Sequence, residues 1–234
     1  MLPRLSKPLT VSSLRHAIGE LCLIVVGVTL ALAANAWYQQ TQLRKEELRE
    51  LQQIRAAIEA DVADFSAFVE SLQQSERDTQ ALWNALESET LSEEFAAQIY
   101  QLTLFRGIQI RSGPYEELRN RGFALISNAS IRSELIDLYE RLATTVRNVA
   151  SVDRDFSSNM IGPYFQENFV FSADGPWTPA KGYDALQRDM YFRNLVAQKL
   201  GRTRRFFLPA PSEYLAAAKK LLAEIDTELA RLSD

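Results

Sequence analysis

The residue types that most often perform catalysis or bind metals are scarce in this chain. It holds one histidine, His16, and one cysteine, Cys22, and neither type occurs again between residues 23 and 234. Ser–His–Asp and Cys–His nucleophiles, and zinc sites made of thiolates or imidazoles, therefore cannot be built in that region. Carboxylate, lysine and tyrosine chemistry is still possible, but the sequence predicts no enzyme, no cofactor and no metal site.

The most site-like stretch gathers guanidinium groups around a glycine. Tyr115, Arg119, Arg121 and Arg132 surround Gly122 in the sequence. Guanidinium groups bind carboxylates and phosphates, so one interpretation is an anion- or peptide-binding patch. The alternative, which we favour, is structural: Gly122 ends a short helix in a left-handed conformation, and the charges pair locally.

Composition limits the partners of the protein. The 234 residues include 26 Lys and Arg against 30 Asp and Glu, and the net charge is -4. Binding to duplex nucleic acid favours a basic face, so we expect no nucleic-acid partner. The length suits one helical domain and a membrane anchor.

An apolar segment near the N-terminus predicts a membrane-spanning helix. Leu21 to Tyr38 are 18 residues without a charge. As a helix they cover roughly 27 Å, which is close to the thickness of the hydrocarbon core of a bilayer. Trp37 and Tyr38 stand at the far end, where such rings prefer the interface between membrane and water. We expect a short segment at 1–16, a transmembrane helix at 17–38 and a soluble domain at 39–234, with the lipid bilayer as a partner.

A cleaved signal peptide is the competing interpretation of this segment. Its basic leader would be Arg4, Lys7 and Arg15, and small residues between 31 and 36 could form the cleavage site. Glu20 at the start of the apolar run, and the helical pattern that continues past Gln39, favour an uncleaved anchor. The basic residues on the two flanks are equal in number, but a short leader before a long polar body favours export of the body. We therefore expect a single-pass protein of the bacterial inner membrane, with a cytoplasmic N-terminus and a periplasmic C-terminal domain.

One face of this helix carries small and polar residues. Glu20 lies beside a stripe that includes Gly27, Ala31 and Asn35. Small residues four apart let two helices approach closely, and an Asn side chain can donate a hydrogen bond across the contact. The pattern indicates a homo-oligomer or a membrane-protein partner. The alternative is that glycine and alanine are simply common in membrane helices and that Glu20 reaches the headgroups.

The body of the chain has the pattern of an all-α fold. No glycine or proline occurs between Gly27 and Gly107, so the membrane helix should continue into a long amphipathic stalk with a coiled-coil-like period. No stretch alternates with period two, and we expect essentially no sheet. The long amphipathic helices predict an antiparallel bundle. The expected later helices are 90–109, capped by Thr90; 113–122; one capped by Ser130 that Gly162-Pro163 ends or kinks; 179–203; and one after Pro211. A loop is expected at 171–182. The apolar stripe of the last helix is expected at Leu215, Ala218, Leu222, Ile225, Leu229 and Leu232.

Two blocks of the sequence resemble a large family of uncharacterised single-pass bacterial membrane proteins, a domain of unknown function. The first block is AIGELCLIVVGVTLALAANAW, and it matches that family's membrane signature at Gly19, Glu20, Gly27, Ala31, Leu32, Asn35 and Trp37. The second is similar to a Tyr-x-x-Leu-x-x-x-Gly block, here Tyr115, Leu118 and Gly122. Asn120-Arg121 departs from the Ser-Ser of many members. The resemblance implies the anchor and the helical fold, and it adds no reaction.

Two functions follow as hypotheses from different classes. The first is a non-enzymatic scaffold or accessory subunit, anchored in the membrane and acting through helix–helix interactions. The alternative is a sensor-like periplasmic bundle that binds a ligand and signals through a membrane partner. A polar cavity in the body would favour the second.

Overall fold

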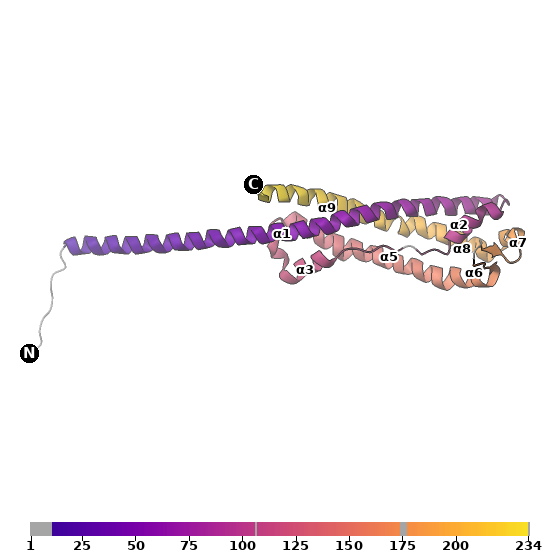
Figure 1. The fold of residues 1–234 in the computed structure, drawn as a ribbon, viewed down its shortest axis with the longest axis horizontal. Helices are drawn as coiled ribbons and strands as arrows, with labels where there is room; N and C mark the ends of the chain where they lie inside the picture. Colours follow the sequence, from indigo (N-terminus) through magenta and orange to yellow (C-terminus); the bar gives the residue numbers. More distant parts are fainter. Residues whose placement is uncertain (1–10, 106, 174–176, 234) are drawn as a thin grey trace, which may run out of the picture. The chain divides into compact units, whose positions relative to one another are not determined.

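The computed structural model describes residues 11–105, 107–173 and 177–233, with side chains from residue 19 onward. Within these residues the backbone is almost entirely helical, and the single strand pair is two residues long on each side (Figure 1). The prediction of an all-α fold is confirmed. The chain divides into two compact units, Met1–Arg49 and Glu50–Asp234.

The first helix, α1 (Val11–Glu87), is 77 residues long. This length follows from the absence of glycine and proline between Gly27 and Gly107. Two residues after the helix ends, Glu89 has a positive φ of 56°. The Thr90 N–H then donates to the Ala85 carbonyl at 3.0 Å, which is the six-residue closure of a Schellman motif.

Short elements follow α1, and two long helical tracts complete the body. The short ones are the 3-10 turn η1 (Glu93–Phe95), α2 (Ala96–Gln101), α3 (Gly113–Arg121) and the 3-10 turn η2 (Phe123–Leu125). The middle tract, residues 129–168, is α4 (Ala129–Ile136), η3 (Asp137–Leu142), α5 (Ala143–Phe156), η4 (Ser157–Ile161) and α6 (Gly162–Asn168). After α7 (Tyr183–Arg188), the C-terminal tract, residues 190–233, is α8 (Met190–Arg202), η5 (Thr203–Phe207) and α9 (Pro209–Ser233). The segments η3, η4 and η5 are π-helical.

Side-chain contacts align the C-terminal tract antiparallel to the second half of α1. The contacts are Arg55 with Asp226 at 2.5 Å, Asp61 with Tyr214 at 3.0 Å and Glu76 with Arg204 at 2.7 Å. Residue numbers rise along α1 as they fall along the C-terminal tract. The two segments therefore run in opposite directions, as Figure 1 also shows.

The middle tract also runs antiparallel to the C-terminal tract. The aligned pairs are Glu134 with Lys220 at 2.5 Å, Arg141 with Glu213 at 3.1 Å and Asp153 with Lys199 at 2.8 Å. Apolar side chains fill the space between these helices. One buried cluster, at the C-terminal end of α1, includes Leu82, Leu86, Phe165, Phe192 and Leu195.

The predicted helix at 90–109 is much shorter in the structure. Instead of a capping box at Thr90, a 3-10 turn begins after Ser92, whose side chain makes no cap hydrogen bond, and α2 ends at Gln101. The Leu91 side chain is buried, and its N–H donates to the Gln187 side chain at 3.3 Å. Because this tertiary contact fixes the position of the backbone before Ser92, the helix begins later in the chain.

The predicted helix at 179–203 is broken at Asp189. This residue has extended backbone angles, and its Oδ1 accepts from the Tyr191 and Phe192 N–H groups at 2.8 and 3.3 Å. Asp189 is therefore the N-cap of α8. Its other oxygen accepts from the Tyr164 hydroxyl at 2.7 Å, a contact from the middle tract that local sequence patterns do not reveal.

Two smaller expectations are also corrected. Of the two alternatives for Gly162-Pro163, an end of the helix is wrong: π-helical η4 precedes it, Pro163 lies in the first turn of α6, and helical backbone continues to Asn168. A kink at this position stays a prediction. The stretch expected as a loop, 171–182, contains the strand β2 (Thr178–Pro179), which pairs antiparallel with β1 (Phe169–Val170) in the register Phe169 to Pro179. The short helix predicted at 113–122 is present as α3, and Gly122 follows it with a φ of 101°.

Candidate functional site

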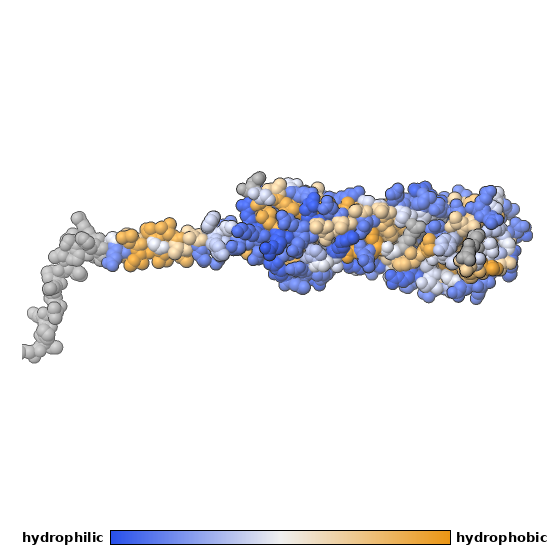
Figure 2. Space-filling view, in the orientation of Figure 1, coloured by the Kyte–Doolittle hydropathy of each residue, from blue (hydrophilic) through white to orange (hydrophobic). Residues whose placement is uncertain are grey.

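The apolar segment of α1 exposes its side chains on every face. An 18-residue window in this helix has a mean hydropathy of 2.0, and none of it is buried in the structure. Figure 2 shows hydrophobic side chains over the visible face of this part of α1. The helix is therefore long and apolar enough to cross a membrane.

The predicted interface residues of this segment all lie on exposed helix. Glu20, Gly27, Ala31 and Asn35 are exposed, and nothing lies within 4 Å of a Cβ built on Gly27. Trp37 and Tyr38 are exposed as well. These residues are thus accessible to a partner helix or to lipid.

The threonine hydroxyl of the apolar segment is satisfied within the helix. The Thr29 hydroxyl donates to the Val25 carbonyl one turn earlier, at 2.8 Å. Such a bond removes the hydroxyl's need for a partner outside the helix. Cys22 is exposed, and the side chain of His16 lies outside the described part of the chain.

In the predicted binding patch, Tyr115 and Arg119 converge on one carboxylate. The Tyr115 hydroxyl and the Arg119 guanidinium donate to Glu140 Oε1 at 2.8 and 3.2 Å, and Arg119 also pairs with Glu116. Burial, and then the hydrogen bond to Glu140, raise the pKa of Tyr115. The same bond, followed by the one from Arg119, lowers the pKa of Glu140. The protein's own carboxylate therefore occupies the position that an anionic ligand would take.

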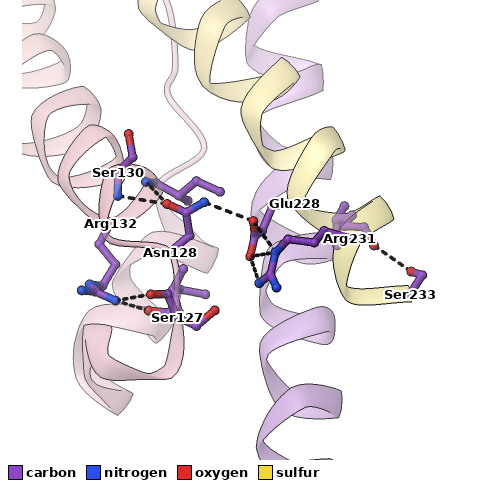
Figure 3. Close-up of polar contacts among 10 residues, drawn as sticks. Ser127, Asn128, Ser130, Arg132, Glu228, Arg231 and Ser233 are labelled. Atoms are coloured by element: carbon purple, nitrogen blue, oxygen red, sulfur yellow. Dashed lines mark hydrogen bonds and ion pairs between the residues drawn. The ribbon is translucent and has the colours of Figure 1, made fainter.

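The other two arginines of the patch contact different groups. Arg121 pairs with the buried Glu50 of α1. Arg132 donates to the carbonyls of Ile126 and Ser127 at 2.5 and 3.0 Å (Figure 3). The four predicted residues thus do not converge on one site: Tyr115 and Arg119 share Glu140, whereas Arg121 and Arg132 contact other groups. Each of these contacts joins parts of the body to one another.

The start of α4 is held by Asn128, whereas the sequence analysis assigned the cap to Ser130. Asn128 Oδ1 accepts from the N–H groups of Ser130 and Ile131 at 3.0 and 3.4 Å. The amide nitrogen of Asn128 donates to Glu228 of α9 at 3.1 Å, and Arg231 pairs with that same carboxylate (Figure 3). The pair with Arg231, and then the Asn128 bond, lower the pKa of Glu228. One side chain therefore caps α4 and ties it to α9.

The most connected buried polar group is one that the sequence analysis missed. Asp61 of α1 is fully buried, and its oxygens accept from the Arg111 N–H, the Arg111 guanidinium and the Tyr214 hydroxyl at 3.2, 3.0 and 3.0 Å. Asp64 takes a second bond from the Arg111 guanidinium at 2.7 Å. A carboxylate lying between Ile58 and Phe65 on an apolar helix face is the sequence signal that could have revealed it.

Three buried tyrosines extend this polar cluster. The Tyr139 hydroxyl donates to the Arg111 carbonyl at 3.4 Å, and the Tyr139 ring stacks on Tyr115 with 4.6 Å between centroids. Burial raises the pKa of Tyr115, Tyr139 and Tyr214, so all three hydroxyls stay protonated as donors. The Asp61 cluster, defined as Asp61, Arg111, Tyr139 and Tyr214, thereby joins α1, the segment before α3, η3 and α9.

A buried ion pair joins the middle tract to the C-terminal tract. Lys199 Nζ lies 2.8 Å from Asp153 Oδ1, both side chains are nearly inaccessible, and the Lys199 ammonium is 5.9 Å from the centre of the Phe207 ring. The described residues contain no group of three or more His, Cys, Asp and Glu side chains that could hold a metal ion. The Asp153–Lys199 pair, like the Asp61 cluster, thus joins different helices of the described body.

Comparisons with known proteins give no relative for this chain. No family model, no curated protein and no solved structure matches it.

Proposed function

We propose that this protein is a non-enzymatic, single-pass membrane protein that acts as a scaffold or accessory subunit through helix–helix interactions. Its body is an antiparallel helical bundle. The observation that carries the proposal is the apolar segment of α1, whose 18-residue window is entirely unburied. Apolar side chains on all faces of one helix are stable only when lipid or another protein covers them.

The polar chemistry of the body supports a role without catalysis. Asp61 and Glu140 each accept hydrogen bonds from an arginine and a tyrosine of the same chain. No histidine or cysteine occurs after Cys22 to supply the commonest acid–base or nucleophilic group. The resemblance to a family of uncharacterised single-pass bacterial proteins agrees with this proposal and is part of it.

Membrane anchoring is tested first. Full-length protein should stay in the membrane pellet after alkaline carbonate extraction and should enter the soluble fraction only with detergent. Edman sequencing of the extracted protein should begin upstream of Leu21. Release by carbonate, or an N-terminus between residues 34 and 37, would remove the anchor from the proposal.

Orientation is tested with an engineered thiol. In a Cys22→Ser background, Asp155→Cys places one thiol at an exposed position of α5. The body is proposed to be periplasmic, so an impermeant maleimide should label this thiol in intact bacterial spheroplasts. Labelling only after lysis would place the body in the cytoplasm.

Self-association is proposed to use the face of α1 that carries Glu20, Gly27, Ala31 and Asn35. Gly27→Leu with Ala31→Leu should weaken cross-linking between chains in native membranes, because leucine side chains prevent close approach of the helices. The matched control is Val25→Leu with Thr29→Leu, which lies on the opposite face at the same spacing. Equal cross-linking by both double variants would exclude this interface, and recovery of a stoichiometric second protein would identify the accessory role.

A further inference from the structure

A polar cavity of about 490 Å³ lies at the C-terminal end of α1, against α7 and α8. Its volume falls in the range of small-molecule sites. Glu87 and Glu89 come from the end of α1, and Asp184 and Arg188 come from α7. The wall is therefore charged, and segments almost 100 residues apart in the sequence form it.

Negative charge dominates this cavity. Glu87, Glu89 and Asp184 are exposed, and none of them forms an ion pair with another described residue. The carbonyls at the end of α1 add the negative end of a helix dipole. The described residues offer no group of acids that could hold a metal ion, so the three carboxylates do not converge on a single ion. They suit a larger organic cation.

The two arginines of the wall have different roles. Arg193 donates to the Leu86 carbonyl at 2.6 Å and lies over the Trp83 ring at 5.6 Å, so it holds the end of α1 in place. Arg188 is exposed and makes no ion pair with another described residue. Its guanidinium is therefore available for an anionic group of a ligand.

A buried amide in the same wall has an unused donor. Gln187 is 8% exposed, and its Oε1 accepts from the Leu91 N–H at 3.3 Å. Its Nε2 has no hydrogen-bond partner among the described residues. This nitrogen is itself closed to solvent, so Gln187 fixes the Leu91 backbone behind the cavity wall and leaves ligand contacts to the exposed charged groups.

We propose that this cavity binds a small zwitterionic amine of amino-acid size. The ammonium group faces Glu87, Glu89 and Asp184, the carboxylate faces Arg188, and the exposed Met190 side chain covers the apolar part. The site lies wholly within residues 86–193 and does not depend on the membrane anchor. Binding here would give the body the sensor-like capacity that the sequence analysis kept as its alternative.

The test uses full-length protein in mild detergent and three probes that differ by one group each. Norleucine carries both charges, pentylamine lacks the carboxylate, and hexanoate lacks the ammonium. Isothermal titration should show saturable binding of norleucine, with pentylamine and hexanoate at least about tenfold weaker, a difference that one lost charged contact accounts for. No saturable norleucine binding at about 10 mM would overturn the site. Equal affinities for norleucine and either single-charge probe would overturn the zwitterion.

Variants at exposed positions test the location without disturbing the core. Asp184→Asn and Arg188→Gln should each weaken norleucine binding by about tenfold. The matched controls are Asp155→Asn and Arg205→Gln, which remove the same charges from exposed helix outside the cavity and should leave binding unchanged. Circular dichroism and thermal melting should be the same for all four variants. Binding that both cavity variants retain would place the norleucine site elsewhere and overturn this assignment.

Discussion

The two halves of α1 use apolar side chains in opposite ways. Near the N-terminus, Leu23 is 75% exposed and its neighbours are exposed on every face; in the body, Leu51, Ile58 and Phe65 are completely buried. The N-terminal half is apolar all round, whereas the body half is apolar along one stripe. A stripe can be covered by other helices of the same chain, but a helix that is apolar all round needs lipid or a partner.

Polar groups differ between the halves in the same manner. Thr29 in the apolar segment bonds to its own helix. Asp61 in the body half bonds to Arg111 and Tyr214, which lie 50 and 153 residues further along the chain. The first half therefore depends on its own sequence and its solvent, and the second depends on partners that only folding brings to it.

The largest expected effect is loss of membrane association. Val26→Arg with Leu30→Arg should move most of the protein to the soluble fraction after carbonate extraction. Each arginine at the centre of a spanning helix costs about 2.5–3.5 kcal/mol of insertion free energy. The control, Ile136→Arg with Val152→Arg at exposed positions of the body, should leave the pelleted fraction unchanged. Equal behaviour of the two double variants would remove the distinction between the halves of α1.

The next largest effect concerns the buried stripe of the body half. Phe65 is fully buried and stacks on Tyr214 with 4.2 Å between centroids. Phe65→Ala should lower the free energy of unfolding by about 3–5 kcal/mol, because it leaves a cavity. Urea denaturation in detergent, followed by circular dichroism, measures the change. The exposed Phe206→Ala is the control and should cost less than about 1 kcal/mol.

Asp61 and Asp64 provide a matched pair for the buried polar cluster. Both contact the Arg111 guanidinium, but Asp61 is completely buried and the Asp64 side chain is 51% exposed. Asp61→Ala should lower the free energy of unfolding by about 3 kcal/mol, since it leaves buried donors without an acceptor. Asp64→Ala should cost clearly less in the same urea titration. Equal losses would show that burial does not decide the strength of these contacts.

A smaller effect is expected in how the free energy of unfolding depends on pH under alkaline conditions. Burial raises the pKa of Tyr214, whereas an unfolded tyrosine titrates near 10. Above about pH 10 the unfolded chain loses this proton while the folded chain keeps it, so the free energy of unfolding falls as pH rises. Tyr214→Phe should reduce that slope by about 1.4 kcal/mol per pH unit. Unfolding free energies measured between about pH 9 and 11.5 test it, and an unchanged slope would contradict it.

The smallest effect distinguishes two neighbouring candidates for one helix cap. Asn128→Ala should lower the free energy of unfolding by about 1 kcal/mol, because the start of α4 loses its acceptor. Ser130→Ala should change it by only a few tenths of a kcal/mol. A larger loss for the serine variant would restore the cap that the sequence analysis assigned.

The last helix, α9, shows how much the sequence could predict about which side chains are buried. Of the stripe expected in the last helix, Ala218, Ile225 and Leu232 are buried as predicted, whereas Leu215, Leu222 and Leu229 are half-buried. The structure buries Tyr214, Leu221 and Glu228 in place of these three leucines. The period was correct, and the buried face is displaced by about half of the angle that separates adjacent residues. Periodicity defines a stripe about 100° wide, and adjacent residues are separated by the same angle. The packing of α9 against α1 and the middle tract selects between the two faces.

The candidate sites also differ in whether the sequence could predict them. The sequence predicted the exposed apolar segment of α1 and the short helix that ends before Gly122, because both follow from local composition. It did not find the Asp61 cluster or the cavity beside Gln187. Their residues come from distant segments, and no local pattern pairs Asp61 with Tyr214.

By itself, the sequence determined three properties of this protein. These are the charge-free apolar segment, a helix that continues because nothing in it stops a helix, and a body without histidine or cysteine. Each is a property of neighbouring residues or of composition. Tertiary structure decided which carboxylate each arginine contacts, which face of α9 is buried and where a polar cavity remains. Contacts between segments far apart in the chain set those outcomes, and a sequence pattern specifies a face without specifying its partner.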